Sequence, residues 1–401
     1  MRKIFGKEGL MPAKLIQKIP SGPPSAAKRF LAFSGLATTA TQMLFMSRPL
    51  SALIRGTYPA YASEYALASW FINYRNGFLS RGLAGSIAAA LFPLDRYVSD
   101  VGLVANVLAV SAIAIWVLYS AALIGKFESD AYLPIAMFCM PWISIFAVDM
   151  MQPRMDLILI FIYEACAVIY LTKTKWRFPV ATAASAAAIF IHQGFALFFV
   201  PFLFILISKR DGMKKAVLYG VLMLAPFALC QFVQVPTEET ILESAYEMQE
   251  ASDFDEGVRL PGLFEGVENR TESMIRMEYG EDKKINNFEL VGESTEGFRS
   301  LFADYVVLSI LLLILYPILS NGLWRNALYA AAVFGCYAVV LYTQTDWLRF
   351  LIFFETGFSC LVATDLLTND AERKIPFADS WFAVLFVAAH QISCLMRTAF
   401  I

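Results

Sequence analysis

Long apolar runs separated by short polar links dominate the pattern along this chain. A helix needs ~20 apolar residues to cross a bilayer, and seven runs reach or approach that length, with two weaker runs beside them. The seven are 102–125, 131–148, 155–172, 216–234, 304–320, 326–343 and 347–367, and the weaker two are 30–47 and 380–398. The pattern predicts an all-α fold, a polytopic transmembrane helical bundle of about 10 or 11 membrane segments.

One further run, 179–208, is 30 residues long and has cations at both of its ends. Because cations favour cytoplasmic loops, a single crossing does not fit this run. Its centre is Ile191-His192-Gln193-Gly194-Phe195, where the glycine permits a turn and the polar pair needs partners or water. We expect a helical hairpin whose tip presents His192 toward the outer side. The alternative is one tilted helix with a satisfied core histidine.

Cation placement sets the orientation expected for the rest of the chain. The first 29 residues carry seven Lys and Arg, so 1–29 is expected to be a cytoplasmic basic tail. An N-terminal transmembrane region then covers 30–234 and includes a long first outer loop of interfacial helices at 48–101. A C-terminal transmembrane region covers 304–401.

Between these two regions lies an acidic insert, 235–303, with 17 Asp and Glu against six Lys and Arg. A cation-poor segment of this kind is compatible with the extracytoplasmic side. We expect a solvated lid or loop there, with a helix around 238–249.

Composition supports contact with lipid and argues against other classes of protein. Hydrophobic residues make up 58% of the 401 and charged residues 16%, far from the balance of a soluble domain. The net charge of −2 argues against the basic surface that binds nucleic acid. Six widely spaced cysteines and two histidines argue against a zinc or redox site.

Polar residues beside membrane spans are costly and are functional candidates by default. Four groups stand out, and the expected threading places all four on the outer side. The first is the aromatic stretch 70–85, where arginines at headgroup depth would hold phosphate through their guanidinium forks. The alternative is contact with bulk lipid headgroups only. The candidate substrate-binding residues of this stretch are Asn73, Arg75 and Arg81.

The second group is a tight turn around Pro153 between two spans. It offers Asp156 as a catalytic candidate, and Asp149, Gln152 and Arg154 for substrate binding. An ion pair that stabilises the corner is the alternative.

The third and fourth groups are the hairpin tip and the start of the run 347–367. The tip offers His192 as a catalytic candidate and Gln193 for substrate binding. The run offers Asp346 as a catalytic candidate and Arg349 for substrate binding, on one helix face; a helix N-cap is the alternative for Asp346. Each of Glu164 and Glu355, inside apolar helices, is expected to pair with an arginine.

The chemistry of such a site is limited by what the outer face can supply. The sequence contains no Walker loop, Rossmann fingerprint, G-x-S-x-G elbow or H-E-x-x-H helix, so cytosolic nucleotide chemistry has no visible site. A lipid-linked phosphosugar is an energy source that the membrane itself carries. Arginines would neutralise its departing phosphate while a carboxylate or His192 accepts a proton from an acceptor hydroxyl.

The order of four short motifs resembles that of bacterial multispanning glycosyltransferases of the GT-C type and of polysaccharide polymerases. The resemblance implies transfer of polyprenyl-phosphate-linked sugars at the extracytoplasmic face, in surface polysaccharide or exopolysaccharide biosynthesis. It also implies a multi-pass protein of the bacterial inner membrane with a cytoplasmic N-terminus. The motifs are Asn73-Tyr74-x-x-Gly77-Phe78-x-x-Arg81-Gly82-Leu83-x-Gly85, Arg154-x-Asp156, His192-x-Gly194 and Asp346-Trp347-x-Arg349.

The chain departs from these families in two places. Its first outer loop lacks an adjacent acidic pair, and Gln193 stands where an acidic neighbour of the histidine is expected. The catalytic carboxylate therefore stays open.

The resemblance implies a polyprenyl-linked sugar donor, a glycan acceptor and membrane lipid as partners, and leaves a polysaccharide assembly complex open. No cofactor is certain and no metal ligands are assigned, while a divalent cation in the acidic insert stays open. Two other functions also stay open. One is a transporter or flippase for a lipid-linked or anionic solute, and the other is a non-catalytic scaffold that docks through the insert.

Overall fold

The structure is a computed structural model in which every described regular element is a helix. This confirms the all-α expectation for the described part of the chain. The expected spans 131–148 and 304–320 lie outside it, as do half of 326–343 and most of 380–398. The described residues are 25–46, 48–56, 64–126, 155–254, 263–279, 331–337 and 347–368, with the single positions 329, 339, 384, 385 and 388.

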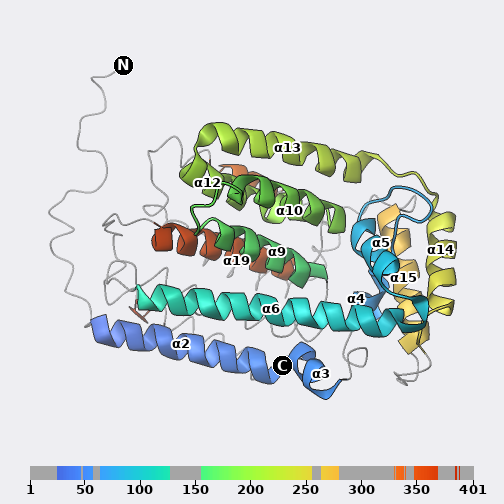
Figure 1. The fold of residues 1–401 in the computed structure, drawn as a ribbon, viewed down its shortest axis with the longest axis horizontal. Helices are drawn as coiled ribbons and strands as arrows, with labels where there is room; N and C mark the ends of the chain where they lie inside the picture. The colour runs from blue at the N-terminus through green and yellow to red at the C-terminus, as the bar shows by residue number, and fades with distance from the viewer. Residues whose placement is uncertain are drawn as a thin grey trace, which may run out of the picture.

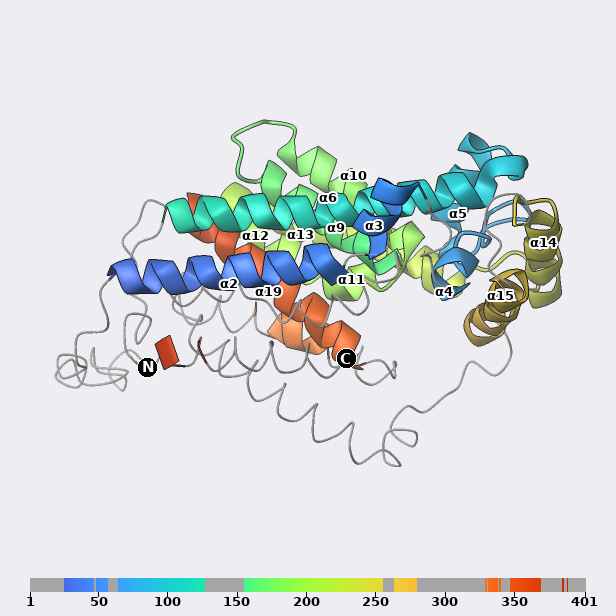
Figure 2. The ribbon, with the colours of Figure 1, turned by 90° about the horizontal axis from the view of Figure 1, so that it is seen from below.

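One set of helices runs side by side through the body of the molecule, and most of the others gather at one end (Figures 1 and 2). The helices of the body are α2 (Ser25–Met46), α6 (Tyr97–Gly125), α9 (Met155–Ile169), α10 (Arg177–Ile191), α12 (Val200–Asp211), α13 (Met213–Phe232) and α19 (Trp347–Thr368). The others are α3 (Arg48–Arg55), α4 (Glu64–Ala68), α5 (Gly82–Leu91), η2 (Leu94–Arg96), α11 (Phe195–Phe198), α14 (Glu238–Glu250) and α15 (Leu263–Tyr279).

Two helices of the described residues are long and apolar enough to cross a membrane, Leu94–Gly125 and α13. In the described part of the chain, α13 leaves a row of large apolar side chains exposed. Exposed apolar area costs about 25 cal/mol per Å² in water, whereas lipid removes that cost. The row comprises Val217, Leu218, Val221, Leu222, Leu224, Leu229 and Phe232.

Aromatic side chains fill the centre of the body. The Phe198 ring lies 4.8 Å from that of Phe353 on α19, and the Phe199 ring stacks 4.7 Å from that of Tyr163 on α9. The Tyr163 hydroxyl also donates to the Gly357 carbonyl at 2.5 Å. These contacts fix α9, α11 and α19 to one another.

The contacts between α19 and the segment α11–α12 show that the two run in the same direction. The contacts follow the same order along both segments. Phe353 contacts Phe198, and Phe358 lies 6.3 Å from Phe202 between ring centroids. Further along, Asp365 pairs with Lys209 at 2.5 Å. The first residues of α19 therefore lie level with the start of α11.

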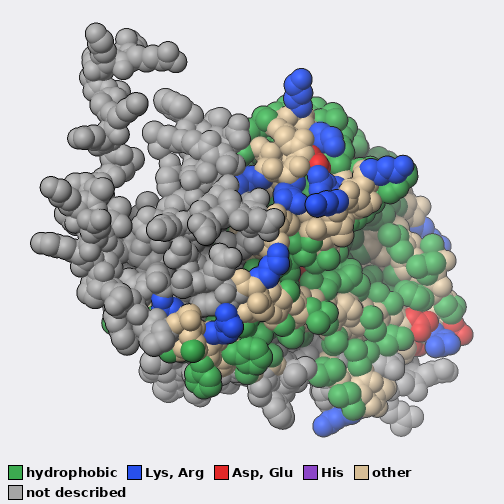
Figure 3. Space-filling model, turned by 60° about the vertical axis from the view of Figure 1, so that its left-hand side comes forward, with side chains coloured by type: hydrophobic (Ala, Val, Ile, Leu, Met, Phe, Trp, Pro, Cys, Tyr) green, Lys and Arg blue, Asp and Glu red, His purple; other side chains and the backbone are tan. Residues whose placement is uncertain are grey.

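Cations gather at the opposite end, which we call the basic end (Figure 3). Arg177 at the start of α10 binds Asp211 at the end of α12, with Nη2 2.5 Å from Oδ1. Lys126, after α6, donates to the Leu367 carbonyl of α19. The described charged residues of this end include Lys126, Lys173, Lys175, Arg177, Lys209, Arg210, Lys214 and Lys215, with Asp211 and Asp365.

The run 179–208 reverses direction at its polar centre. α10 ends at Ile191, α11 follows after three residues, and α12 returns to the basic end. The bond between Arg177 and Asp211 joins the two ends of this run. His192 and Gln193 therefore lie at the end remote from the cations, which we call the loop end.

Candidate functional site

Interfacial helices were expected across 48–101, and α4 and α5 lie there, but the stretch 70–81 between them forms irregular turns at the loop end. Gly77 has φ +127°, a conformation that L side chains rarely adopt. A Cβ at Gly85 would collide with the carbonyl oxygens of Ile72 and Trp70. Glycine thus allows α5 to pack directly on the backbone of this loop.

The loop is also hydrogen-bonded to α5 and to the segment that follows α13. Tyr74 N–H donates to Ser86 Oγ at 2.7 Å, and Val235 N–H donates to the Phe78 carbonyl at 2.9 Å. The Tyr74 hydroxyl is buried without a hydrogen-bond partner, and burial raises the pKa of this phenol above its ordinary value. A fixed loop presents its polar side chains in defined positions.

Arg81 is the residue through which the loop meets the hairpin tip. Its Nε donates to Gln193 Oε1 at 3.1 Å, across 112 residues of sequence. Its φ of 62° is the sole left-handed value among the described residues other than glycine, and such a conformation costs about 1 kcal/mol. Strain of this kind is common at functional sites. Two of the four predicted groups are therefore in direct contact.

The hairpin tip holds His192 in one orientation. Gly194 N–H donates to His192 Nδ1 at 3.0 Å, so a neutral imidazole in this geometry carries its proton on Nε2. A Cβ at Gly194 would approach the rings of His192 and Phe198 within 3.0 Å. His192 is thus arranged to donate a hydrogen bond from Nε2 rather than to accept a proton there.

The other two groups reach the loop end through their helices. Met155, the first residue of α9, packs in one apolar cluster with Leu79 and Ile191, which places the Asp156 backbone near the loop. Arg349 lies one turn before Phe353, so its backbone is level with α11. The side chains that lie outside the described residues are those of Asp156, Arg349 and Glu355, together with Asp149, Gln152, Arg154 and Asp346.

Asn73 and Arg75 contact the insert rather than the hairpin tip. Arg75 Nη1 lies 3.2 Å from Glu247 Oε2, and both side chains are more than half exposed. Asn73 Oδ1 accepts from Arg75 N–H at 2.9 Å, and its Nδ2 donates to the Phe71 carbonyl. These two residues shape the turn and join it to α14.

The described part of the acidic insert is folded and docked, which corrects the expectation of a solvated segment. α14 begins at Glu238 as expected, and the Thr237 side chain accepts from Thr240 N–H at its start. The Asp253 carboxylate accepts from Val98 N–H at 2.7 Å and so caps α6. The expectation was wrong because it rested on the acidic composition of the insert. α15 also has an apolar face, including Val267, Met274 and Ile275, that packs beside the loop.

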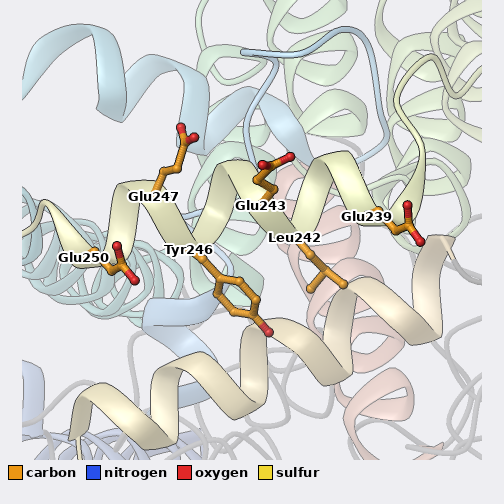
Figure 4. A pocket seen from close by; sticks show the side chains of 6 residues that line it. All are labelled: Glu239, Leu242, Glu243, Tyr246, Glu247 and Glu250. Atoms are coloured by element: carbon orange, nitrogen blue, oxygen red, sulfur yellow. The ribbon is translucent and has the colours of Figure 1, made fainter.

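One hollow of about 430 Å³ lies on α14, and Figure 4 shows its lining. Tyr246 and Leu242 point toward α15, whereas Glu243 and Glu247 point away from it. Burial, and then the nearby Glu272 carboxylate, raise the pKa of Tyr246. Within the described residues no group of three or more candidate metal ligands is present.

Sequence reasoning overlooked the residues that support the site. Asp253 and Glu247 look like any other acids of the insert, and nothing in the sequence pairs them with α6 or Arg75. Gly82 and Gly85 did carry a signal, because two glycines inside an apolar helix are unfavourable unless another chain segment approaches closely. Comparison with models of known families, curated proteins and solved structures gave no match.

Proposed function

We propose that this chain is a polytopic glycosyltransferase or polysaccharide polymerase of the bacterial inner membrane. It would act on polyprenyl-phosphate-linked sugars at the extracytoplasmic face, in surface polysaccharide biosynthesis. The observation that carries the proposal is the bond from Arg81 to Gln193, which joins the interfacial loop to the hairpin tip beside His192.

The separation of charge between the two ends supports the orientation. The basic end gathers lysines and arginines from several connections between helices (Figure 3), as cytoplasmic ends do. The loop end carries the acidic α14 and α15. In this orientation the multi-pass chain has its N-terminal tail in the cytoplasm, and Arg81 and His192 face the outer leaflet.

A phosphate at headgroup depth fits the donors of this end. Arg81 uses Nε for Gln193, and a guanidinium carries further N–H groups on its two terminal nitrogens. The Nε2–H of His192 would add a second donor at the tip. Such donors stabilise the negative charge that develops on a departing polyprenyl phosphate.

The base in this proposal is a carboxylate. His192 Nδ1 is engaged by Gly194 N–H, so accepting the proton of the acceptor hydroxyl falls to Asp156 or Asp346. Asp156 lies in the first turn of α9, and Asp346 directly precedes α19. Both helices begin at the loop end. The transferred sugar would then lie between the arginine and a carboxylate.

Replacing Arg81 with asparagine tests the proposal. Asparagine tolerates the left-handed backbone but lacks the guanidinium, so we expect normal folding and about 100-fold slower transfer. Surface polysaccharide and lipid-linked intermediates would be measured in a strain that expresses only the variant. Arg96→Asn is the matched control, since Arg96 lies in the same outer loop and pairs with Asp100 at the surface. Normal glycan amount and length with well-expressed Arg81→Asn would refute sugar transfer at this site.

A transporter or flippase for a lipid-linked or anionic solute is the second candidate. The observation that favours it is the Lys209–Asp365 ion pair at the basic end, with both side chains 4% exposed. Buried charges at both ends are what a path through the bundle requires. Flux of a lipid-linked sugar into proteoliposomes without a covalent product would favour this function over transfer.

A further inference from the structure

Glu164 is a buried carboxylate that sugar transfer at the loop end does not use. It lies in the middle of α9, 4% exposed, and its Oε2 has no hydrogen-bond partner. None of the ion pairs among the described residues includes it. The arginine partner expected from the sequence is therefore absent from the described part of the chain.

The described titratable groups that interact with Glu164 are weak acids rather than cations. Tyr119 on α6 and Cys360 on α19 both interact with it electrostatically. On α9 itself, Tyr163 donates its hydroxyl to Gly357, and Cys166 is buried.

The remaining helices packed against α9 add no compensating cation within the described residues. α10 carries no titratable side chain between Arg177 and His192. The first charged residue along α12 is Lys209, and its ammonium forms an ion pair with Asp365. Nothing described around Glu164 would compensate its negative charge.

Two hydroxyl groups, those of Tyr119 and Thr364, lie between this region and the basic end. Tyr119 and Thr364 share a short hydrogen bond between their hydroxyls, both of them buried. Thr364 Oγ1 also donates to the Cys360 carbonyl at 2.7 Å, and the next residue of α19, Asp365, pairs with Lys209. Hydroxyls both donate and accept, so they can pass a proton where a carbon side chain cannot.

An ionised carboxylate buried without a cation is strongly disfavoured compared with the neutral acid. We propose that Glu164 is a proton-binding site in the core of the bundle, exchanging its proton with the basic end through Tyr119 and Thr364. Binding places one proton on a carboxylate oxygen, and release returns the carboxylate and the proton. This site goes beyond sugar transfer, because it gives the bundle a group that responds to the proton gradient.

Infrared spectroscopy of the full-length protein in lipid bilayers tests this proposal, because the C=O band of a carboxylic acid is separate from the bands of a carboxylate. We expect a wild-type acid band that titrates reversibly between acidic and alkaline pH and disappears in Glu164→Gln. The matched control Glu247→Gln, at an exposed site, should retain the band. Thermal unfolding would confirm that each variant is folded.

Exchange into D2O tests the route. Tyr119→Phe keeps the ring and removes the hydroxyl, so we expect it to retain the acid band while its shift in D2O becomes at least about tenfold slower. Equal exchange rates in wild type and Tyr119→Phe would overturn the route through Tyr119. A Glu164 that remains a carboxylate at every pH, or an acid that never titrates, would overturn the binding site itself.

Discussion

At the scale of single residues, the loop end depends on positions where the backbone leaves no room for a side chain. Gly82 lies against the Tyr74 ring and Gly85 against two carbonyl groups. An aromatic ring can turn aside, whereas backbone carbonyls can move only with the whole loop. The position of Arg81 next to these glycines thus depends on the absence of two Cβ atoms.

Gly85→Ala should therefore destabilise the protein by about 1–3 kcal/mol, as overpacking of a closed contact does. It should also reduce activity by moving Arg81 away from Gln193. Gly125→Ala is the control, because no atom lies within 4 Å of its added Cβ, and there we expect a change of less than about 1 kcal/mol. Thermal unfolding in detergent measures both; equal stability of the two variants would contradict the close packing of α5.

At the scale of elements, the basic end is joined by buried ion pairs and the loop end by caps and turns. Lys209 and Asp365 connect α12 with α19, whereas Arg75 and Glu247 connect the loop 70–81 with α14 at the surface. Desolvation makes a broken buried pair costly, while solvent screens an exposed pair. The two pairs should therefore differ strongly in their effect on stability.

Lys209→Met should lower the free energy of unfolding by about 3–5 kcal/mol, since it removes the cation that compensates the buried Asp365 carboxylate. The double variant Lys209→Met, Asp365→Leu should recover most of that loss. A parallel double-mutant cycle on Arg75 and Glu247 should give a coupling of at most about 1 kcal/mol. A double variant as unstable as the single one would show that the pair is not what limits stability.

The insert offers a second prediction at this scale. Asp253→Asn removes the charge that caps α6 and should cost about 1 kcal/mol. Hydrogen exchange at Val98 and Ser99, whose N–H groups donate to the carboxylate, should become faster. Unchanged protection of these two amides would show that the insert does not hold the start of α6.

At the scale of the whole molecule, lysines and arginines gather at the basic end, whereas the acidic helices α14 and α15 lie at the loop end. Cysteines introduced at Arg75 and Lys175, with the native cysteines replaced, should react from opposite sides. A membrane-impermeant maleimide should label position 75 in intact cells, and position 175 only after permeabilisation. Labelling of both from one side would remove the basis for an extracytoplasmic site.

The sequence by itself determined the helices and the polar interruptions between them. Apolar runs predicted the helices of 102–125, 155–172, 216–234 and 347–367, because their spacing and composition depend only on neighbouring residues. The same local reasoning selected Arg81, His192 and Gln193.

Only the tertiary structure decided which of these residues meet. The bond from Arg81 to Gln193 spans 112 residues, and the cap from Asp253 to Val98 spans 155. The absence of a cation beside Glu164 among the described residues likewise depends on what the neighbouring helices place around it. A single sequence shows the cost of a buried charge, but the partner that offsets that cost, or its absence, is a property of packing.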